Sequence, residues 1–168
     1  MKKVNLVLSL ILTFGMIFSC TKEVEGPQGP QGPQGQAGPG ASSTTFNVPA
    51  NAWQGDGDGY YVTITNVNIL TQDIVNNGAV LLYWNIDGEW VPLPASFVGG
   101  SWTTHMFFTF SVGEIYLEFQ DDDGFTPNPG SEYGTTTFRV VAIAASGLAE
   151  NPNLDKTNYE EVIKTFNL

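Results

Sequence analysis

The sequence predicts a mainly β fold: an antiparallel β-sandwich over residues 41–168 with a short helix at its C-terminal end. Short apolar runs recur along this part, separated by Gly, Asp, Asn and Pro, which are the residues that turns select. No helical periodicity separates these runs until the end of the chain, which favours a sandwich over an alternating α/β fold. A segment of about 130 residues is long enough to bury a core of its own.

The stretch VTITNVNI, which begins at Val62, changes phase in its middle. Apolar side chains alternate up to Asn66, and the same face continues only after this extra residue. One additional residue in a strand is a β-bulge, so we expect a bulge near Asn66. The next stretch, residues 72–78, is compatible with a short helical turn or a loop.

Two hairpins follow. Asp87-Gly88 is a two-residue turn signal that would place Trp84 opposite Val91. The second turn lies within residues 111–114. The strands expected after the first are residues 79–84, 106–110, 115–119 and 135–145.

The end of the chain carries a helical pattern. Asn158 and Glu161 have the spacing of a capping box. A helix of about two turns is unstable alone, so its apolar stripe should dock on the sandwich. The apolar positions at i, i+3, i+4 and i+7 are Tyr159, Val162, Ile163 and Phe166.

Residues 1–19 have the composition of an export signal, with a basic start and a short apolar run. They end in Ile17-Phe18-Ser19 before Cys20, which resembles the lipobox of bacterial lipoproteins. The resemblance implies cleavage before Cys20 and acylation of that residue, so that lipid chains tether the protein to a membrane. The alternative is an ordinary signal peptide with Cys20 near the cleavage point by coincidence.

Residues 20–25 form the lipidated cysteine and a short tether. Thr21 stands where enteric-type lipoproteins retained at the inner membrane carry aspartate. This favours an outer-membrane lipoprotein, and we expect it to be exposed on the cell surface. Because Cys20 is the only cysteine, no disulfide is available and the fold must depend on its core.

Residues 26–40 form a collagen-like stalk with the sequence GPQGPQGPQGQAGPG. Collagen needs glycine at every third position because no side chain fits at the axis of three packed chains. The stretch spans roughly 45 Å at ~3.1 Å per residue, which is short for a triple helix. It is therefore either a single-chain polyproline-II spacer or the stub of a homotrimer held by confined neighbours. The stalk glycines are Gly26, Gly29, Gly32, Gly35 and Gly38.

The chain as a whole resembles a family of Bacteroidota lipoproteins whose activity is uncharacterised. The resemblance implies a small exported β-rich domain on a collagen-like stub, and it implies no activity or site residue. Besides the lipobox and the collagen-like stub, the motifs that carry it are GAVLLY at 78–83, WVPLP at 90–94, FRVV at 138–141, NLD at 153–155 and YEEV at 159–162.

The charge of residues 41–168 limits the partners. Three basic and fifteen acidic residues give this part a formal net charge of −12. Nucleic acids and anionic lipids need a positive surface, so neither is expected as a partner of the domain. A soluble acidic surface explains the charge without a ligand.

Two acidic runs are candidate Ca²⁺ ligands, and no other cofactor is expected. Dense carboxylates can supply the oxygen ligands that Ca²⁺ prefers, and the two runs could share one ion if their loops meet. Neither run fits an EF-hand loop, and Asp and Gly are also typical of tight turns. The candidate ligands are Asp56, Asp58, Asp121, Asp122 and Asp123.

Trp90 and Trp102 are the candidate ligand-binding pair. Pro92 marks an edge strand or its end, so Trp90 is expected near an edge, where an exposed aromatic platform would suit a surface glycan. Core packing explains most other aromatic residues. His105, the only histidine, lies in an expected strand, and the spacing nominates no nucleophile or acid beside it.

The sequence therefore predicts a non-enzymatic lipoprotein that displays a β-sandwich for adhesion or assembly, with a surface glycan or protein as partner. The alternative is a glycan- or calcium-binding module on the same tether.

Overall fold

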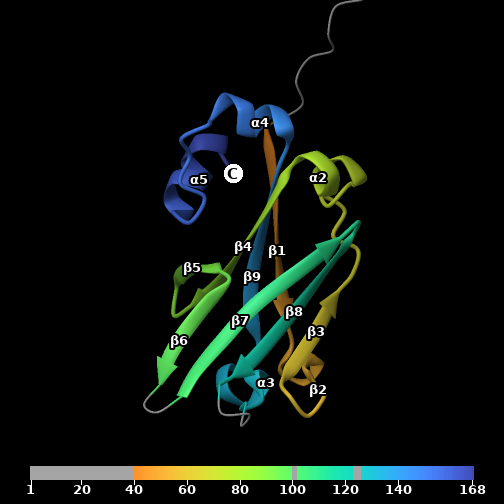
Figure 1. Ribbon diagram of the computed structural model, residues 1–168, viewed down its shortest axis with the longest axis vertical. Coiled ribbons are helices and arrows are strands. Elements are labelled where there is room, and N and C mark those ends of the chain that lie inside the picture. Colours follow the sequence, from red (N-terminus) through yellow and green to blue (C-terminus); the bar gives the residue numbers. More distant parts are fainter. Residues whose placement is uncertain (1–39, 100–101, 123–125) are drawn as a thin grey trace, which may run out of the picture. The chain divides into compact units, whose positions relative to one another are not determined.

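The computed structural model describes residues 40–99, 102–122 and 126–168, and it is mainly β (Figure 1). The expected signal segment, Cys20 and the stalk glycines lie outside these residues. In chain order the elements are β1 (Ala41–Val48), η1 (Ala50–Ala52), β2 (Gln54–Gly55), β3 (Tyr60–Ile64), α2 (Gln72–Asn77), β4 (Ala79–Ile86), β5 (Glu89–Leu93), β6 (Ala95–Gly99), β7 (Trp102–Ser111), β8 (Glu114–Asp121), α3 (Pro129–Tyr133), β9 (Thr136–Ile143), α4 (Ala145–Glu150) and α5 (Tyr159–Phe166).

The strands form two antiparallel sheets. The first sheet has the order β1-β9-β4-β5, and the second has the order β2-β3-β8-β7-β6. Trp84 lies opposite Val91, so the hairpin predicted from the Asp-Gly turn is confirmed. Asp87 and Gly88 have φ values of 50° and 93°, as a two-residue hairpin turn of type I′ requires. The second predicted hairpin is also confirmed, with Ser111 opposite Glu114.

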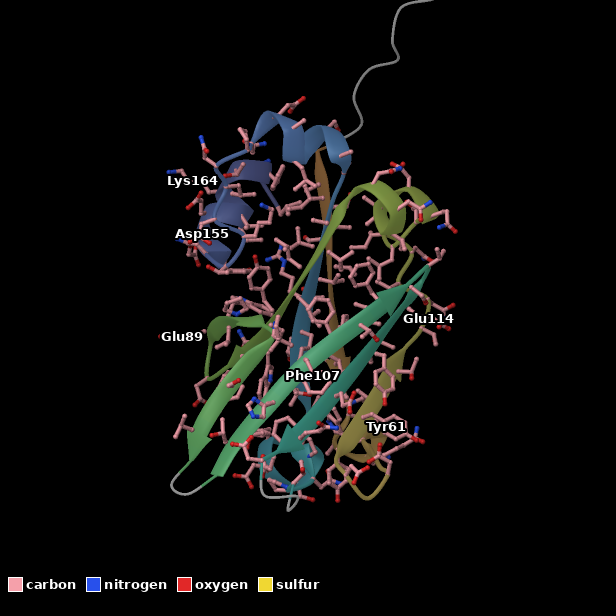
Figure 2. All side chains as sticks on the ribbon, viewed as in Figure 1. Tyr61, Glu89, Phe107, Glu114, Asp155 and Lys164 are labelled. Atoms are coloured by element: carbon pink, nitrogen blue, oxygen red, sulfur yellow. The ribbon has the colours of Figure 1, made fainter. Side chains whose placement is uncertain are left out.

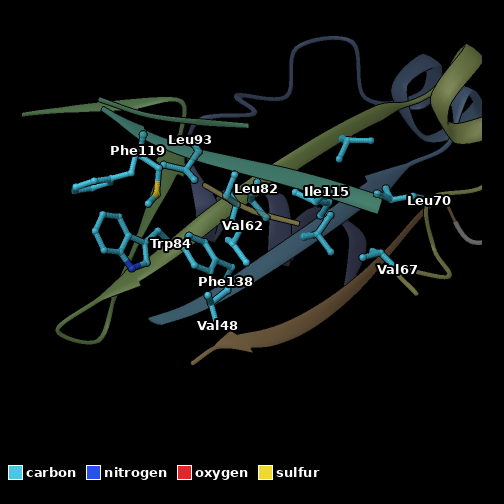
Figure 3. Close-up of a cluster of buried hydrophobic side chains, with 14 of the residues drawn as sticks. Val48, Val62, Val67, Leu70, Leu82, Trp84, Leu93, Ile115, Phe119 and Phe138 are labelled. Carbon is cyan, nitrogen blue, oxygen red and sulfur yellow. The ribbon is translucent and has the colours of Figure 1, made fainter. Parts of the chain in front are cut away.

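The facing sides of the two sheets share one hydrophobic core (Figure 3). Trp84 is 2% exposed and lies among aromatic rings from both sheets. Its ring stacks on Phe138 of β9 and meets Phe97 of β6 and Phe119 of β8 edge-on. The other aliphatic side chains that Figure 3 labels are Val48, Val62, Val67, Leu70, Leu82, Leu93 and Ile115.

The C-terminal segment covers the other side of the first sheet and forms a second hydrophobic cluster. Tyr83 and Val141 point into this cluster from β4 and β9, and Val162 reaches it from α5. Both strands are therefore buried on two sides, which explains why their sequences are apolar at consecutive positions instead of alternating. The short C-terminal helix predicted from the sequence is confirmed as α5.

The cap of α5 differs in part from the predicted capping box. The Asn158 side chain accepts a hydrogen bond from the Glu161 N–H, as expected. The Glu161 carboxylate, however, accepts from the N–H of Asp155 instead of that of Asn158. It thereby ties the connection before the helix to its first turn.

The predicted bulge near Asn66 is wrong. Strand β3 ends at Ile64, and Asn66 has a φ of 62°, so the chain turns there instead of continuing in the sheet. The N–H of Val67 then bonds the carbonyl oxygen of Gly113, which returns the apolar side chain to the core. The adjoining stretch forms α2, capped by the Thr71 hydroxyl at the Ile74 N–H. The helical alternative is thus the one observed.

The described part of the chain begins at Gly40, and we refer to residues 40–168 as the head. The carbonyl oxygen of Gly40 accepts the N–H of Ala144, 3.0 Å away. Gly40 also lies against Gly147 of α4, where an added Cβ would meet backbone. The last residue of the collagen-like stretch is therefore part of the head. Among the described residues, no helix is both long enough and apolar enough to cross a membrane.

Candidate functional site

The structure describes some of the residues that the sequence nominated for binding. Trp90 lies in β5, at the edge of the first sheet, as Pro92 predicted. Trp102 begins β7 of the second sheet, so the two tryptophans belong to different sheets. The side chain of Trp102 and the whole of Asp123 lie outside the described parts of the chain.

Trp90 stacks on an aromatic side chain of α5 rather than standing alone. Its ring and that of Tyr159 are 5.3 Å apart between centroids, with 23° between their planes. Tyr83 meets the ring of Tyr159 edge-on at 5.1 Å. Arg139 holds the same residue from β9, because its Nη1 donates to the Tyr159 hydroxyl over 2.6 Å. Tyr159 is thus fixed on several sides and gives Trp90 a rigid backing.

The turn before α5 sets the position of Tyr159. The carboxylate of Asp155 accepts hydrogen bonds from the N–H and the hydroxyl of Thr157, at 2.9 and 2.6 Å. These bonds lower the pKa of Asp155 below its usual value. The Tyr83 hydroxyl donates to the carbonyl oxygen of Lys156 over 2.8 Å. Burial, with Tyr159 and Asp155 nearby, raises the pKa of Tyr83 to about 12.

A hollow of about 420 Å³ lies beside this aromatic pair, between the β4–β5 turn and the start of α5. Its volume is within the range of about 300–1,000 Å³ that small-molecule sites occupy. Figure 2 shows Glu89 and Asp155, which lie on the two segments that border it. We call it the Trp90 hollow, and its lining residues are Gly88, Glu89, Trp90, Thr157, Asn158, Tyr159 and Glu160.

The polar groups of the Trp90 hollow fall into two kinds. Thr157 and Asn158 use their side chains to hold the turn and the helix cap. Glu89 and Glu160 are exposed, and neither forms an ion pair with another described residue. The hollow therefore combines an aromatic wall with two carboxylates that can accept hydrogen bonds from a ligand.

The two acidic runs do come close together, because the first precedes the start of β3 and the second begins at the end of β8, its antiparallel neighbour. The Thr126 hydroxyl accepts from the N–H of Asp121 and donates to the carbonyl oxygen of Asp58. Their carboxylates are engaged differently, however: the carboxylate of Asp122 accepts from His105, whereas the buried Oδ1 of Asp121 has no hydrogen-bond partner among the described residues. The carboxylate of Asp56 accepts from the N–H groups of its own turn, at Asp58 and Gly59. Among the described residues, no group of three His, Cys, Asp or Glu side chains could hold a metal ion.

His105 has neighbours that sequence spacing did not nominate. Its Nδ1 lies 2.8 Å from the hydroxyl of Ser96 in β6, and its Nε2 lies 2.7 Å from the carboxylate of Asp122. An ionised carboxylate only accepts, so Nε2–H donates to Asp122; in the neutral ring Nδ1 then accepts from the Ser96 hydroxyl, and in the protonated ring Nδ1–H donates to it. This interaction lowers the pKa of Asp122. The signal that could have found Ser96 is strand register, which pairs it directly with His105.

This Ser-His-Asp chain holds the ends of three strands together on an open surface. The side chains of His105 and Asp122 are 39% and 55% exposed, so solvent reaches both. Acyl transfer would also require donors that stabilise an oxyanion. The observed hydrogen bonds link β6, β7 and the residue after β8, which gives this part of the second sheet local order.

The outer side of the second sheet carries a further group of aromatic side chains. Tyr61 of β3 stacks on Tyr116 of β8 with 5.6 Å between ring centroids. Phe107 of β7 lies opposite Glu118, and Figure 2 shows Phe107 and Tyr61 on this sheet. Burial and the charge of Asp56 raise the pKa of Glu118. This surface is acidic and aromatic like the Trp90 hollow, but it is a sheet face rather than a hollow.

Comparison with known proteins adds no relative: no family model, no curated protein and no solved structure matches this chain.

Proposed function

We propose that this chain is a non-enzymatic lipoprotein of the outer membrane that displays its head at the cell surface for adhesion or assembly. Residues 1–19 act as the export signal, lipids on Cys20 hold the chain at the membrane, and residues 26–39 separate the membrane from the head. The class is a tethered binding module, in which the anchor and the ligand surface occupy different parts of one chain.

One observation carries this proposal: the head begins where the collagen-like repeat ends. Gly40 is the last residue of that repeat, and its carbonyl oxygen is already bonded to Ala144 inside the head. Gly40 is followed directly by the first residue of β1, Ala41. If the repeat is a stiff polyproline-II chain or a triple helix, its direction would therefore set the orientation of the first strand.

Anchoring is tested with the variant Cys20→Ser and the matched control Thr21→Ser in a Gram-negative host fed labelled palmitate. We expect the wild-type chain and the control to carry the label and to sediment with the outer membrane. Cys20→Ser should lose the label and leave the membrane fraction. Protease added to intact cells should remove the head from the surface. Retention of label or of membrane association in Cys20→Ser would contradict the proposal.

The stalk is tested by measuring the mass in solution of residues 21–168 and of residues 40–168. The shorter fragment must begin at residue 40, because Ala41 is 7% exposed and pairs with Ile143. Trimers of the longer chain and monomers of the shorter one would establish a triple helix. Monomers of both would establish the single-chain spacer, and display of the head is compatible with either state.

The absence of catalysis is proposed on the geometry around His105 and needs its own test. We expect residues 21–168 to hydrolyse p-nitrophenyl acetate no faster than the variant Ser96→Ala. Turnover by the wild-type chain that disappears in Ser96→Ala, while unfolding of the variant is unchanged, would contradict a non-enzymatic role.

A further inference from the structure

We propose that the Trp90 hollow binds a neutral saccharide. This inference rests on the proposed display function and deepens it by naming a ligand class and a place on the head. Sequence reasoning pointed to Trp90 but paired it with Trp102; the structure instead pairs Trp90 with Tyr159.

The first argument is the aromatic wall. A pyranose ring has a flat side made of C–H groups, and this side packs on an aromatic ring because both surfaces are apolar. Such packing is strongest when the aromatic ring is already immobile, since less rotamer freedom is then lost on binding. Trp90 meets this condition because it lies against Tyr159, which Arg139 and Tyr83 hold in place.

The second argument is the polar rim. Sugar hydroxyls are good donors, and carboxylates accept from them in charge-assisted hydrogen bonds. Glu89 and Glu160 stand on the two segments that flank the rings, one in β5 and one in α5. A ligand that packs on Trp90 can therefore reach a carboxylate on either side of the hollow.

The third argument concerns charge and excludes two other ligand classes. An anionic saccharide would meet Glu89 and Glu160, whereas Arg139 already donates to Tyr159 and Ser43 and Lys156, next to the lining residue Thr157, lies near the carboxylate of Asp155. An organic cation is usually enclosed by several rings set at angles to one another. Trp90 and Tyr159 lie 23° from parallel, so the two rings form a stack and not a cage.

The test uses residues 21–168, which keep the whole head, on an array of neutral, sialylated and sulfated glycans. We expect binding to neutral glycans alone. Calorimetry with the best neutral glycan should then show that Trp90→Ala weakens binding about tenfold or more, as loss of one aromatic contact and its buried area predicts. Glu89→Gln and Glu160→Gln should each weaken it by a smaller factor, since an amide oxygen still accepts.

The matched control is Tyr116→Ala, which removes an aromatic ring from the other acidic aromatic surface of the head. It should bind like the wild-type chain. Denaturant unfolding of every variant separates loss of binding from loss of fold, and the two Gln variants retain side-chain shape if Trp90→Ala proves unstable. Four outcomes would each overturn the proposal. The chain could bind no neutral glycan, or bind acidic glycans only. Tetramethylammonium could compete with the glycan, or Tyr116→Ala could abolish glycan binding while Trp90→Ala leaves it unchanged. None of these outcomes bears on lipidation at Cys20, so the two proposals fail separately.

Discussion

Gly147 is the residue at which a single methyl group should disturb the packing of α4 on Gly40, the first residue of the head. It is buried in α4, and its Cα faces the backbone of Gly40. A Cβ at this position would lie 2.2 Å from the carbonyl oxygen of Gly40, whereas ordinary contacts begin near 3.4 Å. The obstacle is backbone, so no side chain can rotate away. Gly147→Ala must therefore push the first residues of the head outward.

The expected cost follows from three terms. Overpacking of a buried position costs about 1–3 kcal/mol. Displacing Gly40 weakens the hydrogen bond from Ala144, which is worth about 1 kcal/mol. Alanine regains about 1 kcal/mol over glycine through helix propensity, which offsets that loss. We therefore expect Gly147→Ala to lower the free energy of unfolding by about 1–3 kcal/mol.

The assay is urea unfolding of residues 21–168, followed by tryptophan fluorescence. Ala149→Ser, an exposed change in the same helix, is the control and should have little effect. The penalty of Gly147→Ala should shrink in the fragment 41–168, which lacks Gly40 but keeps Ala41 paired with Ile143. A change below about 0.5 kcal/mol, within the usual range for surface substitutions, or an equal penalty in both chain lengths, would refute the reasoning.

Two further predictions concern pH. The pKa of Asp122 is lowered chiefly by the hydrogen bond from His105, so its stabilisation is present above the ordinary value of 3.8 and is lost as pH falls through the lower folded value. Asp122→Asn should therefore unfold at a lower urea concentration than the wild-type chain at pH 7, and the two urea midpoints should be closer near pH 2. An equal difference between the midpoints at the two pH values would contradict this prediction. The pKa of Tyr83 is raised from 10.0 to about 12, mainly by burial, so its contribution is complete below pH 10 and is lost between about pH 10 and 12. Stopped-flow urea unfolding across that range should show that the stability of Tyr83→Phe falls less with rising pH than that of the wild-type chain. An equal fall in stability would contradict the assignment.

Local sequence signals were reliable where one residue type decides the geometry. Asp87-Gly88 determines a hairpin because both positions have positive φ, and Asn158 starts α5 because its side chain caps the first turn. Pro92 placed its strand at a sheet edge. These features depend on neighbours in the chain and can be read without knowledge of the fold.

Signals that depend on distant segments were weaker. Strand β1 was not foreseen, because its sequence is largely Ser, Thr and Asn and it acquires its order from β9. The phase change at Asn66 was taken for a bulge, although it is a turn that a bond between Val67 and Gly113 makes possible. Trp90 was nominated correctly as lying at an edge, but its partner Tyr159 comes from the C-terminal helix, which no local pattern connects with β5.

The N-terminal end of the head and the Trp90 hollow lie at opposite edges of the first sheet. The head begins with β1, and Glu89 and Trp90 belong to β5, with β9 and β4 between the two strands. Ala41 is in register with Ile143, and Ile143 with Ala79, whereas Glu89 is level with Ile86. The seven residue steps from Ala79 to Ile86 correspond to ~23 Å along the strands, and three strand spacings correspond to ~14 Å across them.

A pull between the stalk and a ligand in the hollow would therefore act more along the strands than across them. Such a pull shears the sheet, so that many backbone hydrogen bonds share the load, whereas a pull across one end breaks them in succession. We expect higher unfolding force when residues 21–168 are held by the N-terminus and Glu89→Cys than by the N-terminus and Ala145→Cys, next to the end of β9. Single-molecule pulling at equal loading rates measures the difference. Equal forces would mean that β1 detaches from β9 in the same way under both pulls, and the sheet would then give the proposed tether no mechanical advantage.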